Sequence, residues 1–165
     1  MKIYNAPKST PTQKPNEVSI FLAGSIDMGS AENWQDRLEK DLSQFEDVII
    51  YNPRREDWNS EWVQDPTPGT EFHTQVTWEL DHIEKADLVV VYFSDDSKAP
   101  ITLLEYGRLS TNLDKFVFVY CTPNFYRYGN VKIVADREHI PVFEEYEEFL
   151  KYIKQFVVSS IHNQQ

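Results

Sequence analysis

The 165-residue chain has little cysteine, no long apolar segment and few positive charges. The single cysteine, Cys121, excludes an intramolecular disulfide framework and a cysteine-rich zinc site, and a reducing, cytoplasmic location is the natural expectation. No run of 18 or more apolar residues occurs, so we expect no membrane-spanning segment and no membrane partner. The polar start of the chain lacks the apolar core of a signal peptide, and we expect residues 1–16 to form a flexible arm.

The charge balance is strongly acidic, with 27 Asp and Glu residues against 16 Lys and Arg residues. A protein that binds the phosphate backbone of a nucleic acid clusters its cationic side chains, so this composition disfavours a nucleic-acid polymer as partner. Apolar residues make up 41 % of the chain and aromatic residues 14 %, which is ample for one well-packed core. Length and composition together indicate one domain, which we place at residues 17–161.

Short apolar runs alternate with segments of helical periodicity. The runs typical of strands are 18–23, 48–51, 87–93 and 116–121, with a short candidate at 132–134. The segments with helical spacing are 31–45, 71–85, 100–113 and a last one from Tyr146 onward. This alternation predicts an α/β fold with a mostly parallel, five-stranded sheet that helices cover on both faces.

Ligands of such sheets bind beyond the carboxyl ends of the strands, so the segments that follow strands are candidates for a site. Gly24 and Ser25 begin a small-residue turn after the first predicted strand, where backbone N–H groups can approach a ligand. Its glycine spacing matches neither a dinucleotide-binding fingerprint nor a phosphate-binding loop. A tight turn that needs a glycine explains the same residues equally well.

The segment after the second predicted strand, residues 52–71, is unusually long for a connection in a compact domain. It carries Arg54, Arg55, Trp58 and Trp62. Two tryptophans suit a lid that packs over a flat ring, and a satellite apolar cluster beneath the loop is the alternative.

Two glutamates are the sharpest candidates for chemistry. Glu105 lies near the start of the predicted helix 100–113, among Ile101, Leu103, Leu104 and Leu109, so we expect it to point into a pocket. The helix N-terminus favours its ionised form and the apolar neighbours oppose it. A solvated surface carboxylate is the structural alternative.

Glu79 lies at the edge of the apolar stripe that we expect in helix 71–85, formed by Phe72, Val76, Leu80 and Ile83. A carboxylate there is costly unless it has partners, and a hydrogen-bonded border residue is the structural alternative. Two carboxylates that converge on one cleft are what cleavage of a glycosidic bond requires. His73 and His82 flank Glu79, but their spacing is wrong for a zinc pair, so we expect no metal site.

Four short motifs, which together span about residues 18–130, occur in an order and at spacings that resemble those of a known family. They are Ile20-Phe-Leu-Ala-Gly-Ser-Ile26, Asn52-Pro-Arg-Arg-x-x-Trp58, Glu79 eight residues before Asp87, and Leu104-Glu105-Tyr106-Gly107. Together they resemble the nucleoside 2-deoxyribosyltransferase family, which includes relatives that hydrolyse deoxynucleoside 5′-monophosphates. The resemblance implies a flavodoxin-like or Rossmann-like αβα sandwich, a small-molecule nucleoside or nucleobase as partner, and no cofactor.

The resemblance also implies roles for individual residues. Glu105 matches the nucleophile that attacks C1′ of a 2′-deoxyribonucleoside and expels the base, after which another base or water captures the deoxyribosyl-enzyme ester. Glu79 matches an acidic position that contacts the sugar hydroxyls or the nucleophile. Asn130 matches an asparagine that some members donate from a neighbouring subunit, which implies a homo-oligomer with a shared active site. The substrate-binding positions that follow are Phe21, Ala23, Gly24, Ser25, Asn52, Arg54, Arg55, Trp58, Asp95 and Asn130.

Three positions depart from the family pattern. Phe21 stands where the transferases have a tyrosine, and Ala99 stands where they have an acid, with Asp95 or Asp96 as substitutes. Asp27 stands where the monophosphate hydrolases have a basic residue, and Ala99 stands where they have the serine of their phosphate site. We therefore favour unphosphorylated nucleosides as substrates. Base transfer, hydrolysis of deoxynucleosides or their 5′-monophosphates, and a non-catalytic module that binds a nucleotide derivative all stay open. A phosphoacceptor domain is disfavoured, because no lysine follows the strand 116–121.

Overall fold

The computed structural model describes residues 1–25, 33–55, 63–112 and 114–162. Within these residues, six parallel strands form one sheet with the order β1-β3-β2-β4-β5-β6. The strands are β1 (Lys2–Asn5), β2 (Val18–Gly24), β3 (Val48–Asn52), β4 (Leu88–Phe93), β5 (Phe116–Cys121) and β6 (Val142–Phe143). The helices are α1 (Trp34–Leu42), α2 (Glu71–Lys85), α3 (Pro100–Ser110), α4 (Tyr128–Glu138) and α5 (Tyr146–His162).

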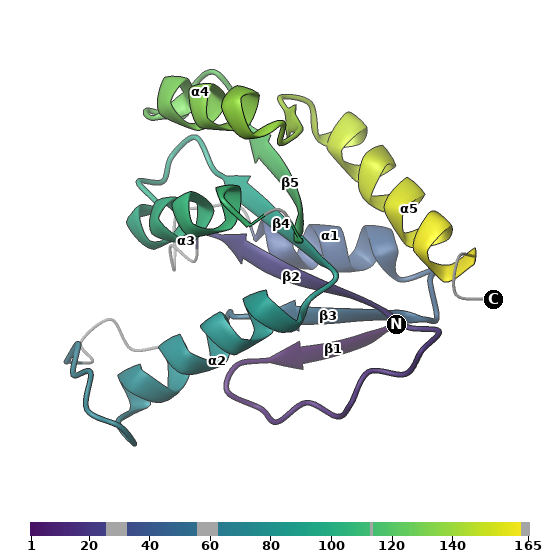
Figure 1. Ribbon diagram of the computed structural model, residues 1–165, viewed down its shortest axis with the longest axis vertical. Helices are drawn as coiled ribbons and strands as arrows, with labels where there is room; N and C mark the ends of the chain where they lie inside the picture. The colour runs from purple at the N-terminus through teal and green to yellow at the C-terminus, as the bar shows by residue number, and fades with distance from the viewer. Residues whose placement is uncertain (26–32, 56–62, 113, 163–165) are drawn as a thin grey trace.

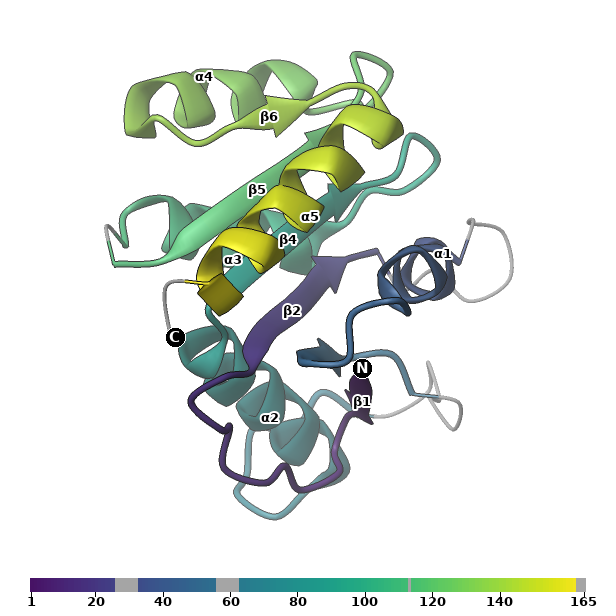
Figure 2. The same ribbon diagram turned by 90° about the vertical axis from the view of Figure 1, so that its right-hand side faces the viewer.

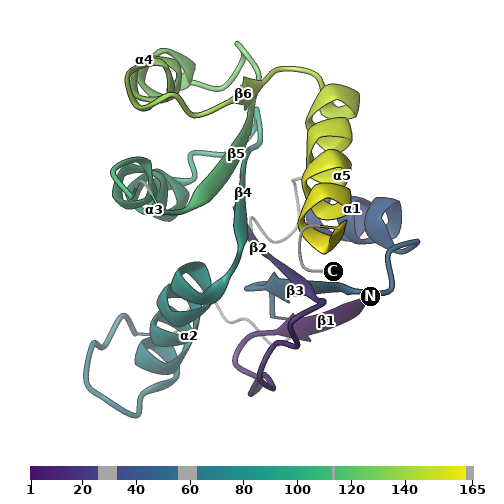
Figure 3. The same ribbon diagram turned by 45° about the vertical axis from the view of Figure 1, so that its right-hand side comes forward.

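Helices cover both faces of the sheet, with α2, α3 and α4 on one side and α1 and α5 on the other (Figures 1 and 3). The side chains of β2 alternate accordingly, as the period of a strand requires. Phe21 and Ala23 face the core under α2, α3 and α4, whereas Ile20 and Leu22 face the core under α1 and α5. Figure 2 shows α5 lying across its face of the sheet. The predicted αβα sandwich is therefore confirmed.

The sheet has six strands where the sequence predicted five. Residues 132–134 lie inside α4 and not in a strand, because Val131 and Ala135 are buried at helical spacing. β6 was missed because it has only two residues, too few to carry a period of its own. β1 was missed because it is a short edge strand with no fully buried side chain. No helix in the described ranges is long and apolar enough to cross a lipid bilayer.

Residues 1–16 were expected to form a flexible arm. In the structure, Lys2–Asn5 form β1, and the segment between β1 and β2 makes hydrogen bonds with α2. Trp78 Nε1 on α2 donates to the carbonyl oxygen of Lys8 at 2.8 Å, and Thr10 Oγ1 lies 3.0 Å from His82 Nε2. Residues 6–14 therefore run along α2 as a strap, and the boundary at residue 17 remains a prediction.

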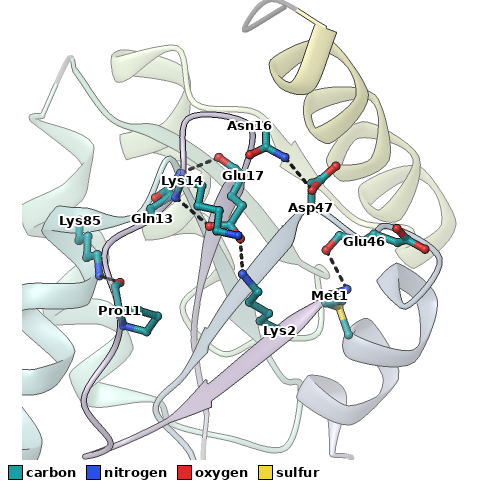
Figure 4. A network of polar contacts seen from close by, with 10 residues as sticks. All are labelled: Met1, Lys2, Pro11, Gln13, Lys14, Asn16, Glu17, Glu46, Asp47 and Lys85. Carbon is teal, nitrogen blue, oxygen red and sulfur yellow. Dashed lines mark hydrogen bonds and ion pairs between the residues drawn. The ribbon is translucent and has the colours of Figure 1, made fainter.

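The strap ends in a polar network at the amino end of the sheet (Figure 4). Lys2 on β1 forms an ion pair with the buried carboxylate of Glu17, and Asn16 donates to Asp47 Oδ1 at 2.9 Å. Gln13 Nε2 donates to the carbonyl oxygen of Glu17 at 2.7 Å. These bonds join both ends of the strap to the sheet.

Helix α2 has the bounds that the sequence predicted, but it buries a different face. Its buried residues are Gln75, Trp78, His82 and Ile83, so only Ile83 of the predicted stripe is fully buried. The rings of Trp78 and His82 stack with centroids 3.9 Å apart and lie under the strap, which the sequence did not reveal. The rotation matters for the site, because it decides where Glu79 points.

Candidate active site

The carboxyl ends of β2, β3, β4 and β5 meet at one edge of the sheet, where ligands of parallel α/β folds bind. Helices α2 and α3 flank this edge on the same face, and both pack on the core that contains Phe21 and Ala23. Each helix contributes one of the two predicted glutamates. Glu79 and Glu105 are both half-buried, and neither faces bulk solvent fully.

The position of Glu105 follows from how α3 is fixed. Tyr106, the next residue, is buried against Phe93 with ring centroids 6.0 Å apart, and its hydroxyl donates to the carbonyl oxygen of Val131 on α4 at 3.0 Å. These contacts set the rotation of the helix. The predicted apolar surround of Glu105 is wrong in part, because Ile101 is 61 % exposed and Leu104 is 70 % exposed.

The two carboxyl groups act on each other electrostatically. Burial and then the negative charge of Glu79 raise the pKa of Glu105 to about 8. Burial also raises the pKa of Glu79, and a hydrogen bond from Gln75 opposes that rise. With a pKa of about 8, the carboxyl group of Glu105 stays largely protonated near neutral pH. A carboxyl group that keeps its proton at neutral pH can serve in acid catalysis.

Gln75 is a residue of the site that the sequence did not single out. Its Nε2 donates to Glu79 Oε1 at 2.7 Å and to the carbonyl oxygen of Pro53 at 3.0 Å. The side chain is 1 % exposed. Its position four residues before Glu79 in a predicted helix was the available signal, because side chains at that spacing lie side by side.

The β2 wall of the site is apolar. Phe21 is buried and its ring centroid lies 6.4 Å from that of Trp78 on α2, and Ala23 is buried beside it. A phenyl ring has no group that can hydrogen-bond a carboxyl. The structure therefore places Phe21 and Ala23 in the core that lines the edge, as packing surfaces.

Gly24 ends β2 where no larger residue fits. A Cβ atom there would lie 2.8 Å from the carbonyl oxygen of Tyr92 and 2.5 Å from the indole of Trp34. The packing explanation of this glycine is thus sufficient. Ser25 follows it, buried, and its carbonyl oxygen accepts from Trp34 Nε1 at 3.3 Å and from Gln35 Nε2 at 3.4 Å. The hydroxyl of Ser25 has no hydrogen-bond partner among the described residues.

Asn52, at the end of β3, is buried and holds the start of the next segment. Its Nδ2 donates to Glu39 Oε1 on α1 at 2.8 Å, and its Oδ1 accepts from the backbone N–H of Arg54 at 2.9 Å. Burial raises the pKa of Glu39. Asn52 thus ties β3 to α1.

Arg54 and Arg55, which lie shortly after Asn52, bind side chains at two different helices. Arg54 Nη1 donates to Asn33 Oδ1 beside α1 at 3.3 Å. Arg55 is buried, and its Nη1 lies 3.2 Å from Glu71 Oε2 in the first turn of α2. Trp58, Trp62 and Asp27 from the sequence predictions lie outside the described residues.

The loops after β4 and β5 are joined by a polar cluster. The carboxylate of Asp95 accepts from the hydroxyl of Thr122 and from Asn124 Nδ2, the latter at 3.3 Å. Asp95 therefore fastens one loop to the other. Asn130 lies exposed in the first turn of α4. Within the part of the chain that the structure describes, no group of three or more His, Cys, Asp or Glu side chains is arranged to hold a metal ion.

Comparisons with known proteins identify the family of the chain. Residues 17–125 match the protein family described as nucleoside 2-deoxyribosyltransferase like. The match covers most of the chain and includes both Glu79 and Glu105, and the chain belongs to this family. Membership associates it with nucleoside processing by glycosyl transfer.

The fold has also been seen in a solved structure, that of a conserved protein from Enterococcus faecalis V583. The two structures superpose with a TM-score of 0.63 over 84 % of this chain and 98 % of the other, at 14 % sequence identity. At that identity the likeness shows the fold alone. A search of curated protein sequences gave no match.

Proposed function

We propose that the protein cleaves the N-glycosidic bond of 2′-deoxyribonucleosides through a covalent deoxyribosyl-Glu105 intermediate and transfers the sugar to another nucleobase. The observation that carries the proposal is the electrostatically coupled pair of Glu79 and Glu105 at the carboxyl edge of the sheet. The family to which the chain belongs supports the same class of reaction.

In the first half of the reaction, an oxygen of Glu105 forms a bond to C1′ as the bond between C1′ and the base nitrogen breaks. The electron pair of the broken bond stays with the base, which takes the proton that the carboxyl pair held. The absence of a 2′-hydroxyl eases the build-up of positive charge at C1′, so an aligned carboxylate can do much of the work. In the second half, a new base attacks C1′, Glu105 leaves, and the pair recovers a proton from the incoming base.

The test is incubation of the protein with each 2′-deoxynucleoside, with and without a second free base, followed by separation of the products. We expect exchange of the base, and a mass increase of one deoxyribosyl group on the intact protein when the first half is trapped. Glu105→Ala is expected to lower turnover by at least about 10³-fold, in line with the loss of a covalent nucleophile. Glu84→Gln, which alters an exposed glutamate on the same helix as Glu79, is the matched control. Full activity in Glu105→Ala contradicts the assignment.

Hydrolysis and ligand binding without turnover are the alternatives. Release of free deoxyribose without exchange indicates hydrolysis of the same bond. Phe21 favours the binding module, because this buried ring offers the carboxyl pair no hydroxyl. A nucleoside that raises the melting temperature without being turned over supports that interpretation, because a ligand that binds only the folded state stabilises it. Ala99 has no side-chain hydroxyl for a phosphate, so we expect unphosphorylated nucleosides to act better than 5′-monophosphates.

We also propose that the protein works as a homo-oligomer in which Asn130 completes the site of a neighbouring subunit. Asn130 is exposed at the start of α4, where it is free to reach another molecule. Three large apolar side chains on α3 and α4 are exposed as well: Ile101 and Leu104 on α3, and Ile133 on α4. Such a surface is typical of an interface between subunits.

A further inference from the structure

The amide of Gln75 is held in one orientation by two acceptors. Its Nε2 donates to the carbonyl oxygen of Pro53 at 3.0 Å and to Glu79 Oε1 at 2.7 Å. A backbone carbonyl accepts hydrogen bonds and never donates one, so the nitrogen must face Pro53. The amide oxygen of Gln75 is buried with no hydrogen-bond partner in the described ranges, which shows that both useful contacts are made by the nitrogen.

This orientation favours the ionised form of Glu79. With the nitrogen of Gln75 turned toward it, Oε1 of Glu79 acts as an acceptor, and an ionised carboxylate accepts a stronger hydrogen bond than the carbonyl oxygen of a carboxylic acid does. A protonated Glu79 that donated to Gln75 would require the amide to flip. The flip would break the bond to Pro53 and turn the amide oxygen toward the carbonyl oxygen of that residue.

We propose that Gln75 is a positioning residue that favours the ionised form of Glu79 and fixes the orientation of its carboxylate. The role rests on the function proposed above. Through Pro53, Gln75 also ties the orientation of Glu79 to the segment that follows β3. The hydrogen bond lowers the pKa of Glu79 against the effect of burial, which agrees with this role.

Several other charged groups of the neighbouring elements have partners of their own. Besides Glu79, α2 carries Glu71, Asp81, Glu84 and Lys85, and α3 carries Glu105 and Arg108, while the segments after β3 and β4 carry Arg54, Arg55, Asp95, Asp96 and Lys98. Arg55 pairs with Glu71, Arg54 bonds Asn33, and Asp95 accepts from Thr122 and Asn124. The β2 side chains on this face, Phe21 and Ala23, are apolar. Among the described residues, Gln75 donates to Glu79, and the charge of Glu79 in turn acts on Glu105.

The test replaces Gln75 with methionine, which keeps the length of the side chain and removes both N–H donors. The readout is the titration of glutamate side-chain carboxyl carbons by NMR on the full chain, with the signal of Glu79 assigned from Glu79→Gln. We expect the apparent pKa of Glu79 to rise in Gln75→Met. In the pH profile of kcat/KM we expect the acidic limb to move to higher pH. On that limb kcat should fall about tenfold for each pH unit by which the limb moves, with KM little changed.

The control is Gln13→Met, because Gln13 makes the same two kinds of bond at the opposite edge of the sheet. Its Nε2 donates to the carbonyl oxygen of Glu17 at 2.7 Å and to Asp87 Oδ2 at 2.7 Å. We expect this variant to lose some stability and to leave the titration of Glu79 in place. In a Glu79→Gln background, Gln75→Met should cause no further change in the pH profile.

An unchanged titration of Glu79 in Gln75→Met overturns the proposal. Should that variant fail to fold, Gln75→Glu provides the second test, because an ionised glutamate at this position cannot donate to Glu79 and must raise its pKa. If the wild-type protein turns over no nucleoside, the proposed function fails while the NMR titration still decides the role of Gln75.

Discussion

Among the described glutamates, Glu105 is a residue whose protonation folding changes strongly. In an unfolded chain a glutamate has a pKa near 4.5, whereas burial and the neighbouring charge of Glu79 raise the pKa of Glu105 to about 8. The folded protein therefore holds a proton at neutral pH that the unfolded chain releases. Glu105 must lose this proton before an oxygen of its carboxylate can bond to C1′ in the proposed first step.

The same raised pKa predicts how stability depends on pH. Because the folded state binds the proton more tightly, the free energy of unfolding should fall as the pH rises from about 4.5 through about 8. Glu105→Gln removes this dependence, so we expect its melting temperature to be close to that of the wild type at about pH 5 and a few degrees higher at about pH 8.5. Thermal unfolding followed by circular dichroism at both pH values measures the difference. If the melting temperatures of Glu105→Gln and the wild type differ by the same amount at both pH values, the pKa of Glu105 is not raised. Glu84→Gln controls for the loss of one negative charge.

At the scale of elements, α2 serves both the site and the strap. One of its faces carries Glu79 and Gln75, and another carries Trp78 and His82, which bind residues 6–14. His82 Nδ1 donates to the carbonyl oxygen of Trp78 at 2.7 Å, so its Nε2 accepts from the hydroxyl of Thr10 at 3.0 Å. Burial lowers the pKa of His82 and so favours the neutral imidazole that this arrangement uses.

The strap should therefore weaken in acid. Because the folded pKa of His82 is lowered, its contribution to the free energy of unfolding is present above pH 6.5 and is lost as the pH falls below that value. Thr10→Val, which removes the hydroxyl that His82 accepts from, is expected to destabilise the protein by about 1 kcal/mol at about pH 7.5 and by less at about pH 5. Chemical denaturation at the two pH values gives the comparison. An equal loss of stability at both pH values would show that the hydrogen bond of the Thr10 hydroxyl does not depend on the neutral form of the His82 ring.

The bounds of α2 could be predicted from the sequence, whereas its buried face could not. Thr70 caps the helix and apolar residues recur at helical spacing, so both ends are visible in the chain. The buried face depends on the strap, which covers Trp78 and His82 and leaves Leu80 37 % exposed. Gln75 was overlooked for the same reason, since its burial follows from that rotation and from Pro53, a residue far away along the chain.

For the whole molecule, the alternation of strands and helices was enough to predict the sandwich. The apolar runs of β4 and β5 are long and identify a parallel core directly. The sequence also indicated that Glu79 and Glu105 would lie near one edge, because their helices flank β4 in the chain and connections between parallel strands keep one hand. β6 and β1 could not be recognised, because a strand of two residues and an exposed edge strand have no clear pattern.

The proposed oligomer gives a prediction at this scale. Light scattering coupled to size-exclusion chromatography should give a mass that is two or more times the 19.4 kDa of one chain. If Asn130 completes the site of a neighbour, Glu105→Ala and Asn130→Ala should each lose activity alone and should recover part of it when mixed and allowed to exchange subunits. Leu104→Asp is expected to dissociate the assembly, since it puts a charge on an apolar interface. A monomer that exchanges bases at full rate contradicts the shared site.

The bond between Tyr106 and the backbone of Val131 has a mechanical consequence. It joins α3 to α4 one residue beyond Glu105 on the first helix and one residue beyond Asn130 on the second. A substitution on the outer surface of α4 that displaces this helix is therefore expected to displace the turn of α3 that carries Glu105, by a route that does not involve the sheet.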